Sequence, residues 1–165
     1  MIPEINKILY TTDLSVNAKY AFGYAMSLAN RYGATITILH VLHVSPTSYS
    51  LVTGIIGEEE WDKLRQNKEQ GVLDKIKDRI KNFCTEASAE VPSCSFITNE
   101  IIVKTGNPAE EILLQTDAGD YDLVVMGARG HGIMTGVMVG SISRRVVKRC
   151  KKPVLVVHLP EGKME

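Results

Sequence analysis

The stretch VVMGARGHGIMTGVMVGSISRRVV, residues 124–147, joins a short apolar run to a helix-like run through a connection that holds five glycines in fourteen residues. A glycine in an ordered segment costs about 0.5–1 kcal/mol relative to alanine, because it loses more backbone freedom on folding. Repeated glycine therefore indicates positive φ angles or a backbone that passes very close to something else. An apolar run followed by a turn and a helix is typical of the repeating unit of a parallel α/β sheet.

Short β-branched runs alternate with helical patterns along the rest of the chain. Strands are expected at residues 7–12, 35–44, 95–103, 122–127 and 153–159. Four helices are expected. The first begins after a cap at Asp13 or Ser15 and ends at Gly33, and the second runs over residues 58–87. The third begins at Asn107, and the fourth runs over residues 141–150. This order predicts an α/β fold with a doubly wound five-stranded parallel sheet and helices on both faces.

The length of 165 residues suits one hydrophobic core. The sequence predicts a single domain over residues 1–160 and a frayed tail at residues 161–165. One segment, SPTSYSLVTGIIG at residues 45–57, shows no clear period and is expected to be a mobile loop. Trp61 is expected to pack in the core or under this loop.

Charge and cysteine content restrict the expected compartment and partners. The 19 Lys and Arg residues balance the 19 Asp and Glu residues, so no overall field draws the chain to nucleic acid or to an anionic membrane. The basic cluster at residues 144–152 lacks interleaved aromatic side chains, which favours a solvated helix face over a nucleic-acid site. Three cysteines without C-x-x-C spacing, and a start without a leader pattern, predict a cytoplasmic protein with no membrane span.

The glycine-rich stretch lies where open parallel sheets bind ligands, beyond the carboxyl ends of the strands. Gly127 ends the expected strand, Gly130 and Gly132 shape the loop, and Gly140 with Ser141 opens the final helix. The free N–H groups and the dipole of that helix make an anion site, to which serine hydroxyls can add donors. The spacing lacks a Walker lysine, and a glycine loop that binds nothing remains the alternative.

The spacing Gly127, two residues, Gly130, nine residues, Gly140 and Ser141 resembles the nucleotide-binding motif of the universal stress protein family, in its ATP-binding subgroup. Further stretches that resemble this family are KILYTTDLS, ILHV, GNPAEEIL, DLVVMGARGHG and KKPVLVV, which together cover nearly the whole chain. The resemblance implies a Rossmann-like fold of the adenine nucleotide alpha hydrolase type.

The resemblance also implies a nucleotide site, residue by residue. The backbone of Val41 would meet the adenine edge, the turn after the first strand would lie beside adenine and ribose, and the Asp13 carboxylate would reach the ribose or Mg²⁺. Thr11 stands where the family often has proline. The full set of expected binding residues is Thr11, Asp13, Val41, Gly127, Ala128, Arg129, Gly130, His131, Gly132, Ile133, Gly140, Ser141, Ile142 and Ser143.

The function expected from this resemblance is ATP binding by a nucleotide-responsive stress module, which forms a homodimer through the edge strand Val154–Val157 and acts on an unidentified protein partner. No catalytic residue is predicted. AMP or a cyclic nucleotide fits the same motif. The alternatives are slow Mg²⁺-dependent ATP hydrolysis through Asp13 and a protein-interaction dimer with no functional nucleotide. His40 and His43 are three apart on a strand and point to opposite faces, so they are not expected to chelate one metal ion.

Overall fold

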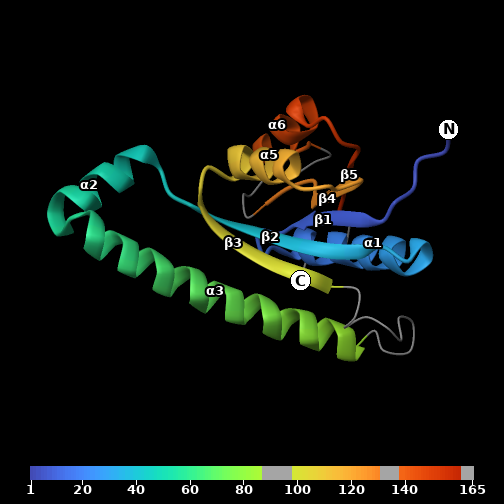
Figure 1. Ribbon diagram of the computed structural model, residues 1–165, viewed down its shortest axis with the longest axis horizontal. Helices are drawn as coiled ribbons and strands as arrows, with labels where there is room; N and C mark the ends of the chain where they lie inside the picture. The colour runs from blue at the N-terminus through green and yellow to red at the C-terminus, as the bar shows by residue number, and fades with distance from the viewer. Residues whose placement is uncertain (87–97, 131–137, 161–165) are drawn as a thin grey trace.

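A five-stranded parallel sheet forms the centre of the computed structural model, which describes residues 1–86, 98–130 and 138–160 (Figure 1). The strand order is β3-β2-β1-β4-β5. The bounds of the strands are β1 Lys7–Thr11, β2 Thr35–His43, β3 Thr98–Gly106, β4 Leu123–Gly127 and β5 Val154–Val157. The chain winds outward from β1 in one direction and then returns to add β4 on the other side, which confirms the doubly wound parallel sheet.

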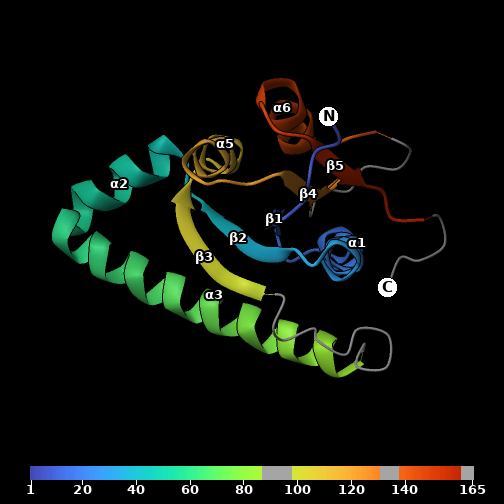
Figure 2. The ribbon, with the colours of Figure 1, turned by 45° about the vertical axis from the view of Figure 1, so that its right-hand side comes forward.

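Helices cover both faces of the sheet (Figure 2). Helices α1 and α3 pack on one face, and α5 and α6 pack on the other. Their bounds are α1 Val16–Tyr32, α3 Glu58–Glu86, α5 Pro108–Ala118 and α6 Ser141–Arg149. Within the described part of the chain, none of the helices combines the length and the apolar composition that a bilayer crossing requires.

Local capping fixes the ends of the helices that position the site. Ser15 Oγ accepts a hydrogen bond from Ala18 N at 3.2 Å, so Ser15 rather than Asp13 is the N-cap of α1. Gly33 ends α1 in the left-handed region, with φ of 67°. Asn107 Oδ1 accepts from Glu110 N at 3.2 Å at the start of α5. The expected glycine end of α1 and the expected asparagine start of α5 are both confirmed.

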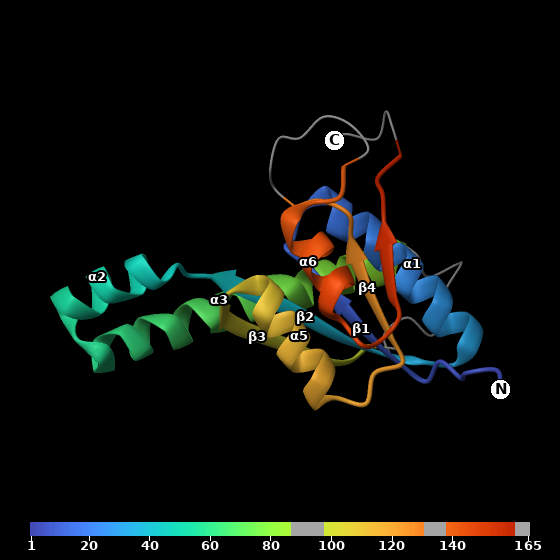
Figure 3. The same ribbon diagram turned by 90° about the horizontal axis from the view of Figure 1, so that it is seen from above.

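The expected loop at residues 45–57 is wrong, because Pro46–Ile56 forms helix α2. Ser45 Oγ accepts from Ser48 N at 3.1 Å, Pro46 occupies the first turn, and Gly57 ends the helix with φ of 83°. No residue of α2 is buried, so the helix has no face in the core. In the sequence, Tyr49, Val52 and Ile56 follow the spacing of one helix face, a short pattern that the loop prediction did not use. Figure 3 shows α2 and the start of α3 as a hairpin that projects beyond the sheet.

Trp61 packs against α2 instead of entering the core. Its ring lies 5.8 Å from the Tyr49 ring, centroid to centroid, in an edge-to-face arrangement. Of the two places expected for Trp61, the core or the underside of the 45–57 segment, the structure has the second, although that segment is a helix. The C-terminal half of α3 reaches the core, where Val72, Ile76, Ile80 and Phe83 pack on the cluster below β1 and β2.

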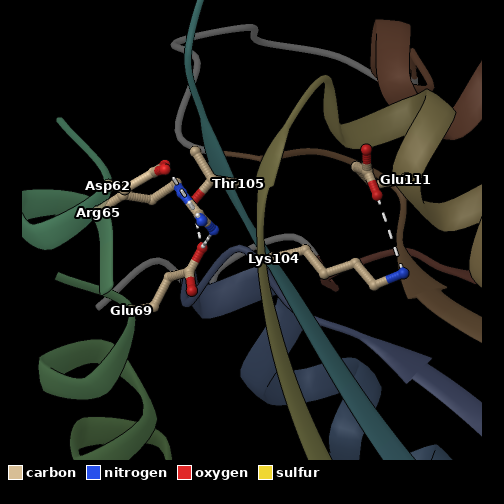
Figure 4. Close-up of polar contacts among 6 residues, drawn as sticks. All are labelled: Asp62, Arg65, Glu69, Lys104, Thr105 and Glu111. Carbon is tan, nitrogen blue, oxygen red and sulfur yellow. Dashed lines mark hydrogen bonds and ion pairs between the residues drawn. The ribbon is translucent and has the colours of Figure 1, made fainter. Parts of the chain in front are cut away.

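The edge strand β3 is tied to helices on both faces of the sheet (Figure 4). Glu69 Oε1 on α3 accepts hydrogen bonds from Thr105 Oγ1 at 2.7 Å and from Arg65 Nη1 at 3.1 Å. Lys104 Nζ lies 3.9 Å from Glu111 Oε2 on α5. Because these contacts use polar side chains at the end of β3, they hold its carboxyl end next to β2 without extending the apolar core.

The Thr37→Val variant is expected to unfold at a higher temperature than the wild type. Thr37 Oγ1 is fully buried in β2, and among the described residues it makes no hydrogen bond. A buried hydroxyl without a partner costs about 1–3 kcal/mol. Replacing it by a methyl of similar size should raise the free energy of unfolding by about 1 kcal/mol and Tm by about 2–4 °C.

Thermal unfolding followed by circular dichroism measures this change. Thr116→Val is the matched control, since its equally buried hydroxyl donates to the Ile112 carbonyl at 2.7 Å. The control should gain no stability, because it loses a satisfied hydrogen bond. A Thr37→Val protein that melts below the wild type would contradict this account of the Thr37 hydroxyl.

Candidate functional site

A cleft opens beyond the carboxyl ends of β1 and β4, where the direction of the strand order reverses. It encloses about 90 Å³, which is below the roughly 300–1,000 Å³ of closed ligand pockets. A larger ligand would therefore extend from the cleft along the edge of the sheet. The lining residues are Thr11, Thr12, Asp13, Ala18, Leu39, Val41, Pro108, Ile112, Met126, Gly127, Arg129, Gly130, Ile142 and Ser143.

Most of the residues expected to bind a nucleotide meet in this cleft. The fold brings together Thr11, Asp13, Val41, Gly127, Arg129, Gly130, Ile142 and Ser143. Gly140 and Ser141 stand beside it at the start of α6, whereas Ala128 is fully buried and does not line the cleft. His131, Gly132 and Ile133 lie outside the described residues.

The turn that follows β1 is held in a fixed shape by its own hydrogen bonds. Thr12 Oγ1 accepts from Leu14 N at 3.0 Å, and Asp13 Oδ1 accepts from Ser15 N at 3.0 Å. Leu14 adopts a left-handed conformation with φ of 67°, which is uncommon for a branched side chain. Arg79 of α3 donates to the Leu14 carbonyl at 2.8 Å. Several partners thus offset the strain at Leu14 and fix the position of Asp13.

His40 supports the same turn from β2. Its Nδ1 lies 2.7 Å from the Thr12 carbonyl, and its side chain is buried. His43, three residues later, is exposed at the end of the strand. The expectation that these two histidines do not chelate one metal ion together agrees with this separation, and His40 is buried behind the turn rather than lining the cleft. The contact depends on the turn after β1 lying beside β2, and no local pattern in the sequence reports it.

The glycines of the motif are explained by close backbone approach. A Cβ at Gly127 would lie 3.2 Å from the Asn17 carbonyl carbon and 3.3 Å from Ala18 N in α1. A Cβ at Gly130 would overlap Oδ2 of Asp13, which places this carboxylate against the loop after β4. A side chain at Gly127 would therefore press on the backbone of α1, and a side chain at Gly130 would displace the Asp13 carboxylate.

Two bonds tie the loop after β4 to its neighbours. Gly140 N donates to the Ala128 carbonyl at 2.7 Å, and Ala128 N donates to the Val157 carbonyl at 2.8 Å. A Cβ at Gly140 would lie 3.3 Å from the Ala128 carbonyl oxygen. Gly140 and Ala128 therefore hold the backbone of the loop together, and this contact positions the start of α6.

The N-terminus of α6 presents a set of uncommitted backbone donors. Gly140 is its N-cap and supplies no side-chain acceptor. Among the residues described in the structure, none accepts a hydrogen bond from N–H of Ser141, Ile142 or Ser143. The Ser143 hydroxyl, in contrast, donates to the Gly127 carbonyl at 2.9 Å. The anion-binding capacity here thus comes from backbone N–H groups and the helix dipole, and the Ser143 hydroxyl proton is already used.

Val41 offers a donor and an acceptor on the other side of the cleft. Thr12 N donates to the Leu39 carbonyl, so the odd-numbered residues of β2 direct their backbone groups toward β1. Val44 N donates to the Gly106 carbonyl, so the even-numbered residues face β3. Since β1 ends at Thr11, opposite Leu39, the N–H and carbonyl of Val41 face the open cleft. This pair matches the donor–acceptor edge of a planar base.

An ion pair fixes α6 to α5. Arg149 contacts the Glu110 carboxylate through both Nη atoms. The hydrogen bond from Arg149 lowers the pKa of Glu110 from its ordinary value. Both side chains are about half exposed, and the pair therefore acts mainly on the orientation of α6.

Comparison with known proteins identifies relatives over nearly the whole chain. The model described as Universal stress protein family matches residues 4–158. The chain is 32% identical over 156 residues to universal stress protein YxiE of Bacillus subtilis, covering 93% of this chain and 99% of that protein. It is 29% identical over 155 residues to universal stress protein MJ0577 of Methanocaldococcus jannaschii, with 92% and 93% covered.

Solved structures share the fold. Universal stress protein UspA from Lactobacillus plantarum aligns with a TM-score of 0.69 at 24% identity, covering 94% of this chain and 99% of that one. A universal stress protein in complex with cAMP aligns at 0.59 with 21% identity and 94% and 98% coverage. The protein from Archaeoglobus fulgidus in complex with dAMP aligns at 0.53 with 16% identity and 94% and 99% coverage.

Proposed function

The chain belongs to the universal stress protein family, and from this premise we propose that it binds ATP in the cleft beside β1 and β4 and acts as a homodimeric, nucleotide-responsive module. The observation that carries the proposal is the pairing of two sets of open backbone groups across one cleft. Val41 offers a donor and an acceptor on one side, and the first N–H groups of α6 face an anion on the other.

Each group in the cleft fits one part of an adenine nucleotide. A base whose edge bonds to Val41 would have apolar faces, and Leu39, Ile112 and Met126 supply apolar walls for them. The phosphates would lie at the α6 N-terminus, with the Arg129 guanidinium lining the same cleft. The turn after β1 lies between these two places, beside the position of the ribose.

Two solved relatives support an adenine ligand, since one is a complex with cAMP and another a complex with dAMP. Both ligands carry an adenine and one phosphate. The preference for ATP rests on the resemblance of the spacing from Gly127 to Ser141 to the motif of the ATP-binding subgroup.

Asp13 fits a magnesium ion that arrives with the nucleotide. Mg²⁺ is commonly held by one or two carboxylates together with phosphate oxygens and water. Among the described residues no group of three or more acidic, histidine or cysteine side chains could hold a metal by itself. Asp13 Oδ1 accepts from Ser15 N, and Oδ2 lies against Gly130 beside the α6 N-terminus. Asp13 would thus supply one carboxylate to an ion whose other ligands come from the phosphates.

The proposed homodimer uses the free edge of β5. This strand is the last of the sheet, and Val154, Leu155 and Val156 are half buried. An edge strand with apolar side chains is a template for pairing with another chain. A second copy of the same strand, related by a two-fold axis, would cover this edge in a self-complementary way.

Identification of the nucleotide in freshly purified protein tests the proposed function. We expect denaturation to release ATP, detected by chromatography and mass, and the double variant Gly140→Ala/Ser141→Ala to release little or none. Gly54→Ala is the matched control, because a Cβ there meets no atom within 4 Å and lies on α2, away from the cleft.

Release of AMP or a cyclic nucleotide alone would confirm the adenine site and contradict the assignment of ATP. If nothing is released and added ATP does not raise Tm, the nucleotide proposal fails, because binding to the native state must stabilise it. A dimer without a nucleotide would then be the better description.

A further inference from the structure

A second cavity lies on the opposite side of the sheet from the nucleotide cleft. It encloses about 380 Å³ between α1, α3 and the ends of β1 and β2, within the range of small-molecule sites. Its apolar floor consists of Tyr10, Phe22, Ile38, Ile76, Ile80 and Phe83.

Strand alternation places the β1 and β2 side chains of this cavity and of the nucleotide cleft on opposite faces of the sheet, although Thr12 lines both. Tyr10 and Ile38 point to the face covered by α1 and α3, whereas Thr11 and Leu39 point to the face covered by α5 and α6. The hydroxyl of Tyr10 donates to the Ala18 carbonyl at 2.6 Å, so its ring contributes an apolar surface to the cavity floor.

The rim of the cavity carries more positive than negative charge. Lys19 of α1 and Arg79 of α3 line it, together with one acid, Glu86. Among the described residues, no salt bridge joins Lys19 or Arg79 to a carboxylate. Arg79 uses Nη1 on the Leu14 carbonyl, which leaves further N–H donors of its guanidinium. A neutral apolar ligand would contact the apolar floor but would make no ion pair with Lys19 or Arg79.

We propose that this cavity binds an amphipathic monocarboxylate, with the hydrocarbon body against Ile38, Ile76 and Ile80 and the carboxylate between Lys19 and Arg79. Apolar burial supplies the attraction for the hydrocarbon. The two cations select the anionic head over a neutral one through charge-assisted hydrogen bonds. This site lies on the other face of the sheet from the nucleotide cleft, and the two meet at the turn after β1, where Thr12 lines both and Arg79 holds the Leu14 carbonyl.

Isothermal titration calorimetry with decanoate, kept below its micellar concentration, tests the proposal. We expect one decanoate to bind each chain saturably, with a Kd below about 1 mM. Decanol, which has the same chain and no charge, should bind about tenfold more weakly. The double variant Lys19→Gln/Arg79→Gln should lower decanoate affinity about tenfold and leave decanol binding unchanged.

Two further variants locate the site. Ile80→Trp fills the cavity from a half-buried position and should abolish binding of both probes. Lys77→Gln removes an exposed charge from the same helix without lining the cavity, and should bind decanoate as the wild type does. Thermal unfolding of each variant establishes that it is folded.

The proposal would be overturned by the absence of saturable decanoate binding, by equal affinity for decanoate and decanol, or by unchanged binding in a folded Ile80→Trp protein. Displacement of decanoate by ATP would also overturn it, since it would place the probe in the nucleotide cleft. Failure of ATP to bind at all would leave the decanoate measurements as they are, so the two proposals fail separately.

Discussion

The Ser141→Glu variant is expected to bind ATP about a hundredfold or more weakly than the wild type while unfolding at the same or a higher temperature. Ser141 is the first residue of α6 and its side chain is exposed. A carboxylate in the first turn interacts favourably with the helix dipole, worth about 0.3–1 kcal/mol. The same carboxylate repels a polyphosphate, by about 3 kcal/mol for each pair of unit charges about 5 Å apart at an effective dielectric constant of about 20.

Titration calorimetry with ATP on nucleotide-free protein measures the affinity, and thermal unfolding without ATP measures stability. Ser141→Gln is the matched control, because it has the same length as glutamate and no charge. We expect it to bind ATP within a few-fold of the wild type, and added salt should narrow the gap between the two variants. Equal affinity in Ser141→Glu and Ser141→Gln would show that the phosphates do not lie at the start of α6.

The Val156→Pro variant is expected to have the 18.2 kDa mass of one chain in solution, whereas the wild type is expected to have twice that mass. The Pro153 carbonyl accepts from Val124 N of β4, and the Val157 carbonyl accepts from N of Ala128, the residue after β4. Backbone groups alternate along a strand, so those of Val154 and Val156 point away from the sheet. Proline at position 156 therefore removes an outward N–H while all hydrogen bonds to β4 remain, as edge strands tolerate.

Light scattering coupled to size-exclusion chromatography, at micromolar protein, gives both masses. Val156→Ala is the control, since it shortens the same side chain and keeps the N–H that a paired strand would use. It should remain a dimer, although a weaker one. A wild-type protein with the mass of one chain would contradict the proposed dimer, and a dimeric Val156→Pro protein would move the interface away from the β5 edge.

The parts of the fold that depend on residues adjacent in the sequence were predictable. Gly33 can adopt the left-handed conformation that ends α1, and Asn107 followed by Pro108 has the chemistry that begins a helix. The alternation of apolar strands with helices predicted the parallel sheet, because a helix that connects two strands brings the second strand back parallel to the first. Helix α2 was missed, because Ser45 followed by Pro46 resembles an ordinary turn and Gly54 interrupts the helical pattern.

The candidate site was predictable as a set of residues but not as an arrangement. The glycine spacing and the resemblance to the universal stress protein family named eight residues that line the cleft. They did not predict that Ser143 Oγ is used on the Gly127 carbonyl, or that Ala128 is buried. The supporting contacts of His40 with Thr12 and of Arg79 with Leu14 join residues 28 and 65 positions apart. Contacts between such distant residues leave no periodic pattern in the sequence.

The sequence by itself determined the order of the five strands and of the helices other than α2, the end of α1, the start of α5 and the glycine-rich connection after β4. Each of these features depends on local backbone conformation or on a period within one element. Only the tertiary structure decided that β1 ends at Thr11, opposite Leu39, which opens the backbone of Val41, and that Asp13 lies against Gly130. It also decided that a cavity with two cations lies on the other face of the sheet. These features arise from the pairing of β1 with both β2 and β4, whose residues are far apart in the chain, and from the alternation that sends neighbouring side chains to opposite faces.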